Sequence, residues 1–399
     1  MLIGRGPDGP IAGRPVAITG IGAVTCCGTG ADALWAQLLH PTVTGERRVP
    51  DFDPSAWFGP KEARRLDRFA QMSVAAAELA RTDAGPLDED PDRCGVIYAS
   101  GVGGFQTLVE QVLVCDRKGA DRVSPFLVPM LMANAGAANV SMRFGWHGPS
   151  ETISTACAAG THAVAAAARL IASGVCDVAI GGGAEAAIQE VAVGAFTNMT
   201  ALSSSGISRP FDSRRDGFVI AEGAAALVLE DKARAVARGA RIYAEIAGAA
   251  STADAHHITA PDPNGTGAVS CMELALEDAG LRARDVGHIN AHGTSTPLND
   301  LAEARAIHKV FGEPGPPVTS AKGLTGHSLG AAGAIEAVAS TLTIFHGVIP
   351  PTAGLEELDP EIGLDVVAGQ PRPFTPAPVL SNSFGFGGHN GCLVVVPAA

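Results

Sequence analysis

The chain has 399 residues, of which 46% are hydrophobic, 5% aromatic and 17% charged, and its formal net charge is −13. This length is too great for one simple core and fits two domains or one large duplicated α/β domain. The negative charge argues against binding of nucleic acid, which needs clustered Lys and Arg. No apolar stretch of membrane-helix length is evident, so no insertion into a membrane is expected.

The N-terminal residues 1–13 are polar and glycine-rich, without the hydrophobic run of a secretion signal, so the expected location is cytoplasmic. The eight cysteines form no CxxC pair, and all but one are expected to be small buried hydrophobes. Neither a disulfide framework nor a zinc site is expected in such a chain, and no metal is assigned.

The expected elements alternate between strands and helices along the whole chain. They are, in order, a strand at 15–20, helices at 31–39 and 61–80, a strand at 94–99, a helix at 161–173, strands at 177–181, within 218–229 and from 242, a helix at 268–279, a strand at 286–291, a helix at 299–310, a strand at 318–320, a helix at 330–346, and strands at 379–384 and 391–396. The least regular stretches are 195–216 and 249–266. This alternation predicts an α/β architecture with helices on both sheet faces.

One cysteine stands apart from the others. Cys157 lies in the stretch TACAAG, between small residues, where a loop is expected to turn into an alanine-rich helix. The unpaired N–H groups and partial positive charge of a helix N-terminus favour the thiolate, which is the nucleophilic form. The small neighbours leave room for a substrate carbonyl, although a cysteine among alanines is more often simply part of a core.

Two histidines lie in glycine-rich segments far downstream, His292 in NAHGTSTP and His327 in KGLTGHSLG. One Cys with two such His indicates acyl transfer through a thioester. His147 and His288 are instead expected at the surface. The segment GHSLG also fits a nucleophile elbow around Ser328, but a hydrolase of that kind would leave Cys157 and His292 unexplained. Its acid would be Asp359, Glu361 or Asp365, and its histidine His389.

Each of these motifs lies where an expected strand gives way to a loop, which is where α/β active sites gather. The chain resembles a β-ketoacyl-(acyl-carrier-protein) synthase of the type II condensing-enzyme group. The segments that carry the resemblance span nearly the whole chain: 155–160, 209–212, 216–223, 290–297, 322–333 and 382–390. It implies the thiolase fold, a five-layered αβαβα arrangement of two duplicated halves, divided here into residues 1–240 and 241–399, and a homodimer.

The resemblance also implies the roles of the site residues. Cys157 takes an acyl group from acyl carrier protein, His292 and His327 assist the decarboxylation of malonyl carrier protein, and the resulting enolate attacks the Cys157 thioester. The other roles are a structural Lys322, a gating Phe386 whose N–H helps to bind the thioester oxygen, structural Glu336 and Asp300, and substrate contacts from Thr294, Thr296, Val102 and Phe384. No cofactor is implied, since the phosphopantetheine arm belongs to the carrier protein.

Docking of an acidic carrier protein needs a local basic patch on this acidic chain. Lys61, Arg64, Arg65 and Arg68 have the spacing of one helix face and are the predicted docking residues, although such a face is often merely solvated. The segment 201–208 is shorter than its counterpart in the family and lacks its charged residues, which weakens one part of the expected docking surface.

Several functions remain compatible with the sequence. The leading hypothesis is elongation in fatty acid biosynthesis. A condensing enzyme of a secondary-metabolite (polyketide) pathway, or a drug-tolerant duplicate of the housekeeping synthase, would carry the same motifs. A non-catalytic partner of the chain-length-factor kind conflicts with the presence of Cys157, His292 and His327. A thiolase would need a second catalytic cysteine, and Cys392 lies in no such motif.

Overall fold

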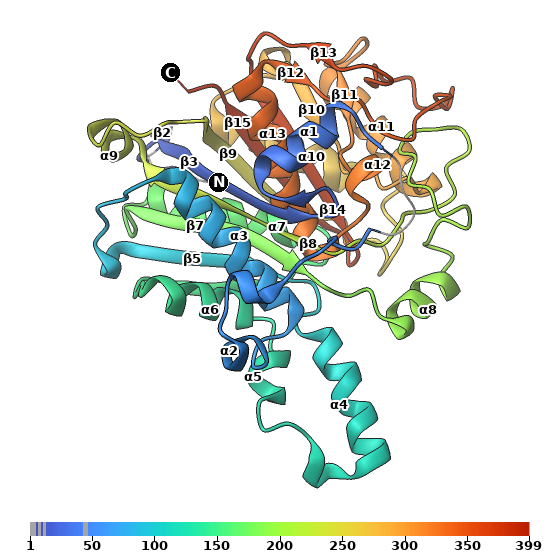
Figure 1. The fold of residues 1–399 in the computed structure, drawn as a ribbon. Coiled ribbons are helices and arrows are strands. Elements are labelled where there is room, and N and C mark those ends of the chain that lie inside the picture. The colour runs from blue at the N-terminus through green and yellow to red at the C-terminus, as the bar shows by residue number, and fades with distance from the viewer. Residues whose placement is uncertain (1–4, 7–8, 11–12, 43–46, 399) are drawn as a thin grey trace.

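The structure is a computed structural model that describes residues 5–6, 9–10, 13–42 and 47–398 (Figure 1). Most of the polar N-terminal stretch, residues 1–4, 7–8 and 11–12, lies outside the described residues.

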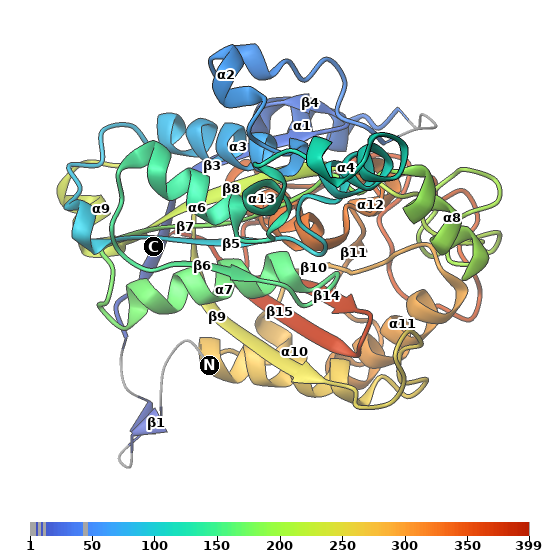
Figure 2. The same cartoon turned by 90° about the horizontal axis from the view of Figure 1, so that it is seen from below.

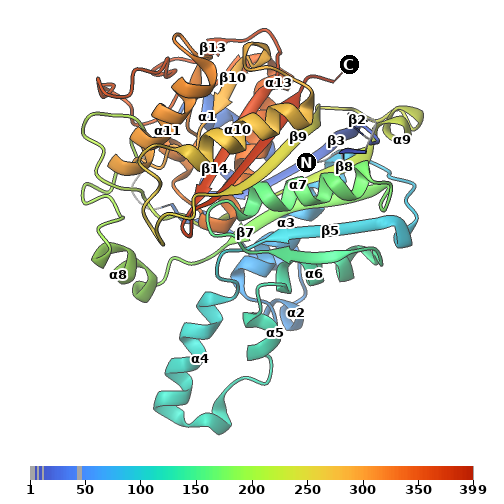
Figure 3. The same cartoon turned by 180° about the vertical axis from the view of Figure 1, so that it is seen from behind.

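Ten of the described strands form one continuous ladder in the order β11-β10-β14-β15-β9-β3-β8-β7-β5-β6 (Figures 1 and 3). Their bounds are β3 Val16–Thr25, β5 Cys94–Ala99, β6 Ser150–Ile153, β7 Val178–Glu185, β8 Gly223–Asp231, β9 Ala244–Ala253, β10 His288–Asn290, β11 Val318–Thr319, β14 Val379–Gly385 and β15 His389–Val396. The short strand β4, Gly28–Thr29, pairs with β3, and two separate small ribbons pair β1 (Arg5–Gly6) with β2 (Gly9–Pro10) and β12 (Val348–Ile349) with β13 (Arg372–Pro373).

This ladder consists of two similar sheets. The first runs β3-β8-β7-β5-β6 and the second β9-β15-β14-β10-β11. In each, neighbours among the first three strands pair antiparallel and neighbours among the last three pair parallel. An antiparallel pairing of β3 with β9 joins the two sheets. The repetition confirms the two duplicated halves. The predicted division between residues 240 and 241 falls in the segment before β9 and stays a prediction.

The helices are α1 Ala31–Leu39, α2 Pro60–Ala63, α3 Arg68–Ala84, α4 Phe105–Lys118, α5 Leu127–Leu131, α6 Ala135–Phe144, α7 Ala159–Ala172, α8 Glu190–Asn198, α9 Lys232–Ala237, α10 Thr266–Ala279, α11 Pro297–Phe311, α12 Lys322–Thr325 and α13 Ala332–His346. Short 3₁₀ turns cover Pro54–Ala56, Pro91–Arg93, Ala120–Arg122, Ala283–Asp285 and Leu329–Ala331.

The helices and sheets stack in five layers, as expected for the thiolase fold (Figure 2). Helices α3 and α6 cover the outside of the first sheet, α7 and α13 lie between the sheets, and α10 covers the outside of the second with α11 beside it. The middle helices pack closely, because a Cβ on Gly333 of α13 would lie 2.4 Å from the backbone nitrogen of Thr161 on α7. The close packing of α7 and α13 also brings together the segments that precede them. Cys157 lies just before α7, and His327 lies just before α13.

The first strand is longer than predicted. Gly20 was expected to end it in a turn, but β3 continues to Thr25 and is buried throughout. The glycine serves helix packing instead, since a Cβ on Gly20 would lie 2.2 Å from the carbonyl oxygen of Ala80 on α3.

The prediction of a single helix at 61–80 is wrong. The chain forms the short α2, breaks at residues 64–67, and starts again as α3. The break is fixed by Asp67, whose buried carboxylate accepts hydrogen bonds from the N–H groups of Phe69 at 3.1 Å and Thr107 at 2.8 Å. The hydrogen bond from the Phe69 N–H makes Asp67 the N-cap of a new helix, α3.

One helical stretch, Leu329–His346, is long and apolar enough to cross a membrane by length and composition, but 89% of it is buried inside the protein. It is the middle-layer helix α13 with the turn before it, and its apolar composition is explained by contacts with both sheets.

Candidate active site

Cys157 lies immediately before α7, in a tight turn at the centre of the molecule. Ala156 adopts φ of 49°, a left-handed conformation that is uncommon outside glycine, so the turn presenting the thiol is backbone-strained. The side chain is 8% exposed and opens into a cavity of about 540 Å³. This placement matches the sequence prediction of a cysteine at the start of a helix.

Both predicted histidines reach the same cavity. His327 Nε2 lies 3.0 Å from Cys157 Sγ, and the ring centroid of His292 lies 5.5 Å from that of His327 at an interplanar angle of 84°. His292 follows β10 and His327 follows α12, so three loops from both halves of the chain converge here. The Nδ1 atoms of both rings are buried without a hydrogen-bond partner among the described residues.

Burial sets the protonation states in this site. It raises the pKa of the Cys157 thiol to about 11, against the opposing effects of the Phe386 backbone N–H and the Lys322 charge. The pKa values of His292 and His327 fall well below their usual range, first through burial and then through the charge of Lys322. The resting site therefore holds a thiol and two neutral imidazoles. The expectation of a thiolate from the helix N-terminus is not met, because desolvation outweighs it.

Lys322 lies behind the histidines and does not face the cavity. Its side chain is 1% exposed, forms an ion pair with Glu336, which is equally buried, and donates to the carbonyl oxygen of His292 at 2.7 Å. The two structural residues that the resemblance implies thus pair with each other, and Lys322 also holds the backbone of the His292 loop.

Two further carboxylates, those of Glu303 and Asp300, support the loop that carries His292. The sequence analysis did not predict a role for Glu303. Glu303 accepts hydrogen bonds from the backbone nitrogens of His292 and Gly293, both at 2.8 Å. Asp300, which the resemblance suggested, accepts from the backbone nitrogens of Ser295 at 3.1 Å and Phe211 at 2.9 Å. Burial raises the pKa of Glu303 to about 7 and that of Asp300 to about 6.

The predicted substrate-binding residues Val102, Thr294, Thr296 and Phe384 all line the cavity, and so does the predicted gating residue Phe386. The hydroxyls of the two threonines are 2.9 Å apart, and the Phe384 ring centroid lies 6.0 Å from that of His292. Apolar side chains complete the wall, among them Phe196, Met199, Phe218 and Leu298. Such a lining fits a thioester with an apolar chain.

The four predicted docking residues do not form one helix face, because the helix breaks between them. Lys61, Arg64 and Arg65 are exposed, and the Arg65 guanidinium lies 4.5 Å from the centroid of the Phe126 ring. Arg68 is different: it makes an ion pair of 2.6 Å with the buried Glu222. Arg68 is therefore a structural residue, and the patch shrinks to the other three.

The hydrolase hypothesis fails on geometry. Ser328 is 2% exposed, and within the described part of the chain none of its hydrogen bonds goes to a histidine. Two of the three candidate acids are engaged with arginines, Asp359 with Arg215 at 2.5 Å and Asp365 with Arg372 at 2.6 Å.

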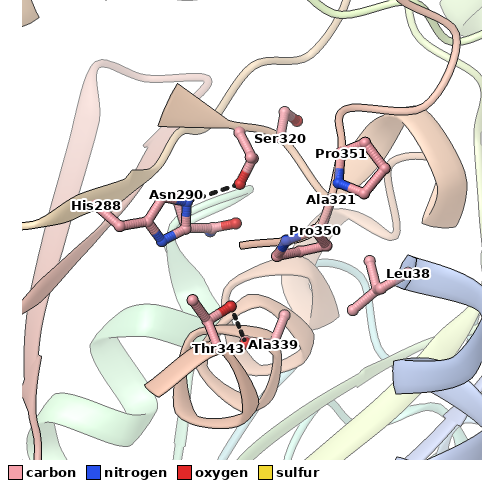
Figure 4. Close-up of a pocket in the computed structure, with 10 residues that line it drawn as sticks. Leu38, His288, Asn290, Ser320, Ala321, Ala339, Thr343, Pro350 and Pro351 are labelled. Carbon is pink, nitrogen blue, oxygen red and sulfur yellow. Dashed lines mark hydrogen bonds between the residues drawn. The ribbon is translucent and has the colours of Figure 1, made fainter. Parts of the chain in front are cut away.

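His288 is buried, not exposed as expected, whereas His147 is exposed as predicted. His288 lines a second cavity of about 10 Å³, which has room for no more than one water and lies between β10, α13 and the proline segment at 350–351 (Figure 4). Its Nε2 lies 2.9 Å from the Thr319 hydroxyl, and burial lowers its pKa to about 3. This cavity is too small to take a substrate.

His162 on α7 is a polar residue near the site that the sequence analysis missed. It is 8% exposed, with Nδ1 2.7 Å from Thr155 Oγ1 and Nε2 3.1 Å from the carbonyl oxygen of Asn390. In the sequence, only its position five residues after Cys157, on the helix expected there, could have indicated that His162 lies near the site.

A thiolase fold with a buried cysteine beside two histidines defines a class of acyl-transferring enzymes, and comparison with known proteins narrows it. Residues 41–235 match the profile described as "Beta-ketoacyl synthase, N-terminal domain", and residues 243–356 match "Beta-ketoacyl synthase, C-terminal domain". The chain belongs to the β-ketoacyl synthase family.

Individual relatives cover almost the whole chain. A Synechocystis protein named 3-oxoacyl-(acyl-carrier-protein) synthase 2 is 42% identical over 404 residues, covering 95% of this chain and 97% of the relative. The ishigamide ketosynthase/chain length factor structure has a TM-score of 0.91 at 35% identity, covering 97% and 100%. A type II polyketide ketosynthase solved in complex with its acyl-carrier protein has a TM-score of 0.89 at 31% identity, again covering 97% and 100%.

Proposed function

We propose that this protein is a 3-oxoacyl-(acyl-carrier-protein) synthase, which extends an acyl chain by two carbons in fatty acid biosynthesis. The observation that carries the proposal is the contact of 3.0 Å between Cys157 Sγ and His327 Nε2, with His292 beside it in a large apolar cavity. The name of the Synechocystis relative supports this choice.

In the first half-reaction, Cys157 Sγ attacks the carbonyl carbon of an acyl thioester on the carrier protein. The carbon–sulfur bond to the carrier breaks, and the departing sulfur takes up the proton that Cys157 loses. The backbone N–H groups of Cys157 and Phe386 both approach Sγ, where they can bind the oxyanion of the tetrahedral intermediate. His327 Nε2 is placed to accept the thiol proton and return it to the leaving sulfur.

In the second half-reaction, malonyl carrier protein loses carbon dioxide. The bonding electrons pass into an enolate, whose carbon attacks the Cys157 thioester and forms the 3-oxoacyl product. The carbon–sulfur bond to Cys157 breaks, and the expelled thiolate takes up a proton from solvent to restore the thiol. His292 and His327 are neutral, so each can present an N–H to the enolate oxygen as charge develops there. The largely apolar lining of the cavity strengthens these hydrogen bonds.

Other residues hold the reactants and the loops. We propose that Thr294 and Thr296 bind the pantetheine arm, that Phe386 gates the cavity and that Val102 meets the far end of the acyl chain, because all four residues line the cavity. Lys322 positions His292 through its carbonyl and acts neither as base nor as nucleophile. Each step uses groups of the chain and its substrates, so we propose that no cofactor takes part. Among the described residues, no cluster of three or more side chains is suited to hold a metal ion.

We also propose a homodimer, on the evidence of the segment formed by α4 and α5. This segment extends away from the body of the protein (Figures 1 and 3) and exposes Val112, Leu113, Phe126, Val128 and Met132. Exposed apolar side chains gathered on one feature mark an interaction surface. Light scattering should report twice the chain mass, and Val128→Asp should lower it.

The partner in catalysis is an acyl carrier protein, and a solved relative is a complex with one. Lys61, Arg64 and Arg65 are proposed as part of its docking surface. We place the enzyme in the cytoplasm, where soluble carrier proteins are available.

A second candidate is chain building in a polyketide pathway, which the structural likeness to a type II polyketide ketosynthase favours. The experiment that tests both is turnover with malonyl carrier protein and a series of acyl carrier proteins. Repeated use of saturated acyl groups supports fatty acid elongation. Preference for acyl groups that retain a 3-oxo group supports the polyketide candidate, and the absence of any condensation contradicts both.

A further inference from the structure

The ring of His162 bridges two segments that are far apart in the sequence. A backbone carbonyl can only accept, so Nε2 must carry the proton and donate it to the Asn390 carbonyl at 3.1 Å. Nδ1 then accepts from the Thr155 hydroxyl at 2.7 Å. Burial lowers the pKa of His162, which favours this neutral form. The contacts therefore select one tautomer and hold the ring in one orientation.

The two bridged segments are the parts of the site that carry the backbone N–H groups near Sγ. Thr155 lies in the turn that presents Cys157. Asn390 lies on β15, opposite Phe384 on β14, beside the hairpin tip that bears Phe386. The tip lies against the turn: a Cβ on Gly385 would be 2.9 Å from the backbone nitrogen of Cys157.

The residue before His162 makes a second connection to the same hairpin. Thr161 Oγ1 lies 2.7 Å from Ser383 Oγ, in a buried contact between α7 and β14. Thr161 and His162, consecutive residues in the first turn of α7, thus form hydrogen bonds to β14 and β15, the two strands of the hairpin. Only His162 also reaches back to the nucleophile turn, through Thr155.

We propose that His162 is a positioning residue that holds the Cys157 turn and the Phe386 hairpin tip in register, so that their two N–H groups converge on one thioester oxygen. The inference rests on the proposed function. Two donors from different segments bind an oxyanion well only if their separation is fixed, and loss of one such donor costs about 100- to 1,000-fold in rate. Loosening the bridge displaces a donor without deleting it, so a loss of at least about 10-fold is expected.

The test compares two reactions of the same thiol. Acylation of Cys157 by hexanoyl carrier protein passes through an oxyanion, whereas alkylation by iodoacetamide displaces iodide at a saturated carbon and forms none. His162→Leu should slow acylation at least about 10-fold and leave alkylation within about twofold. His162→Gln should recover most of the acylation rate, because an amide offers one donor and one acceptor.

Two further variants keep the test decisive. Thr155→Val retains the branched shape but removes the hydroxyl, and it should reproduce the selective loss even if His162→Leu does not fold. His288→Leu is the matched control: it removes another buried histidine that contacts a threonine, at the small cavity of Figure 4. It should lower thermal stability and keep the ratio of the two rates.

The outcomes separate the inference from the proposed function. Equal slowing of acylation and alkylation in the His162 and Thr155 variants, or no slowing of acylation in either, would overturn the positioning role. A parent protein whose Cys157 is alkylated but never acylated by carrier-bound thioesters would instead overturn the proposed function.

Discussion

Replacement of Lys322 by methionine tests how the buried ion pair behind the histidines works. Lys322 and Glu336 are each 1% exposed, so Lys322→Met leaves a carboxylate buried without its cation. Breaking a buried pair in this way costs about 3–5 kcal/mol. That is a large share of the roughly 5–15 kcal/mol that stabilises a typical protein, so the variant should unfold at clearly lower urea concentration.

The double variant Lys322→Met/Glu336→Met separates stability from activity. Replacing both members of a buried pair by apolar side chains is often neutral or stabilising, so the free energy of unfolding should return to within about 1 kcal/mol of the parent value. Condensation should stay depressed by about 100-fold. In the parent protein Lys322 donates to the His292 carbonyl at 2.7 Å, and the double variant lacks this donor. A small displacement of a reacting group is enough to cause a rate loss of that size.

The assay pairs urea unfolding, followed by circular dichroism, with release of free carrier thiol during condensation. A double variant as unstable as the single one would refute the ion-pair reasoning. A double variant that regains full activity would refute the positioning of His292 by Lys322.

Three other expectations follow from the site. The rate of Cys157 alkylation by iodoacetamide should rise about tenfold per pH unit from pH 7 to 10, because the pKa of the thiol is raised to about 11 and the thiolate fraction grows with pH; a plateau below pH 8 would contradict the buried-thiol state. Phe386→Ala should slow acylation more than decarboxylation, since a loop between glycines gates the cavity, and equal losses would point to a collapsed oxyanion site. Arg64→Glu/Arg65→Glu should raise the KM for acyl carrier protein at least about fivefold at low salt and leave small thioesters unaffected, with exposed Arg284→Glu as the control; an unchanged KM would remove this patch.

Much of the fold could be predicted because local patterns suffice for buried elements. The helix at 31–39 and the strand at 94–99 are confirmed with the same bounds. The errors have long-range causes. The break before α3 depends on Asp67 bonding Thr107, which lies in a different helix, and the length of β3 depends on the approach of α3 to Gly20.

The site shows the same division. Cys157, His292 and His327 could be proposed from their motifs, and the structure brings them together in one cavity. Glu303 and His162 could not, because each has a backbone partner that only the fold brings close, the nitrogen of His292 for Glu303 and the carbonyl oxygen of Asn390 for His162. The protonation state of Cys157 was missed for a related reason: a helix start is visible in a sequence, whereas full desolvation of the thiol is not.

The measurement that tests the central claim most directly is the separation of the two half-reactions by substitution. Cys157→Ala should abolish condensation and keep measurable release of carbon dioxide from malonyl carrier protein, because the N–H donors of His292 and His327 remain. His327→Ala should lose decarboxylation while a labelled acyl group still appears on Cys157. Normal condensation by Cys157→Ala, or a labelled acyl group trapped on Ser328, would contradict the account.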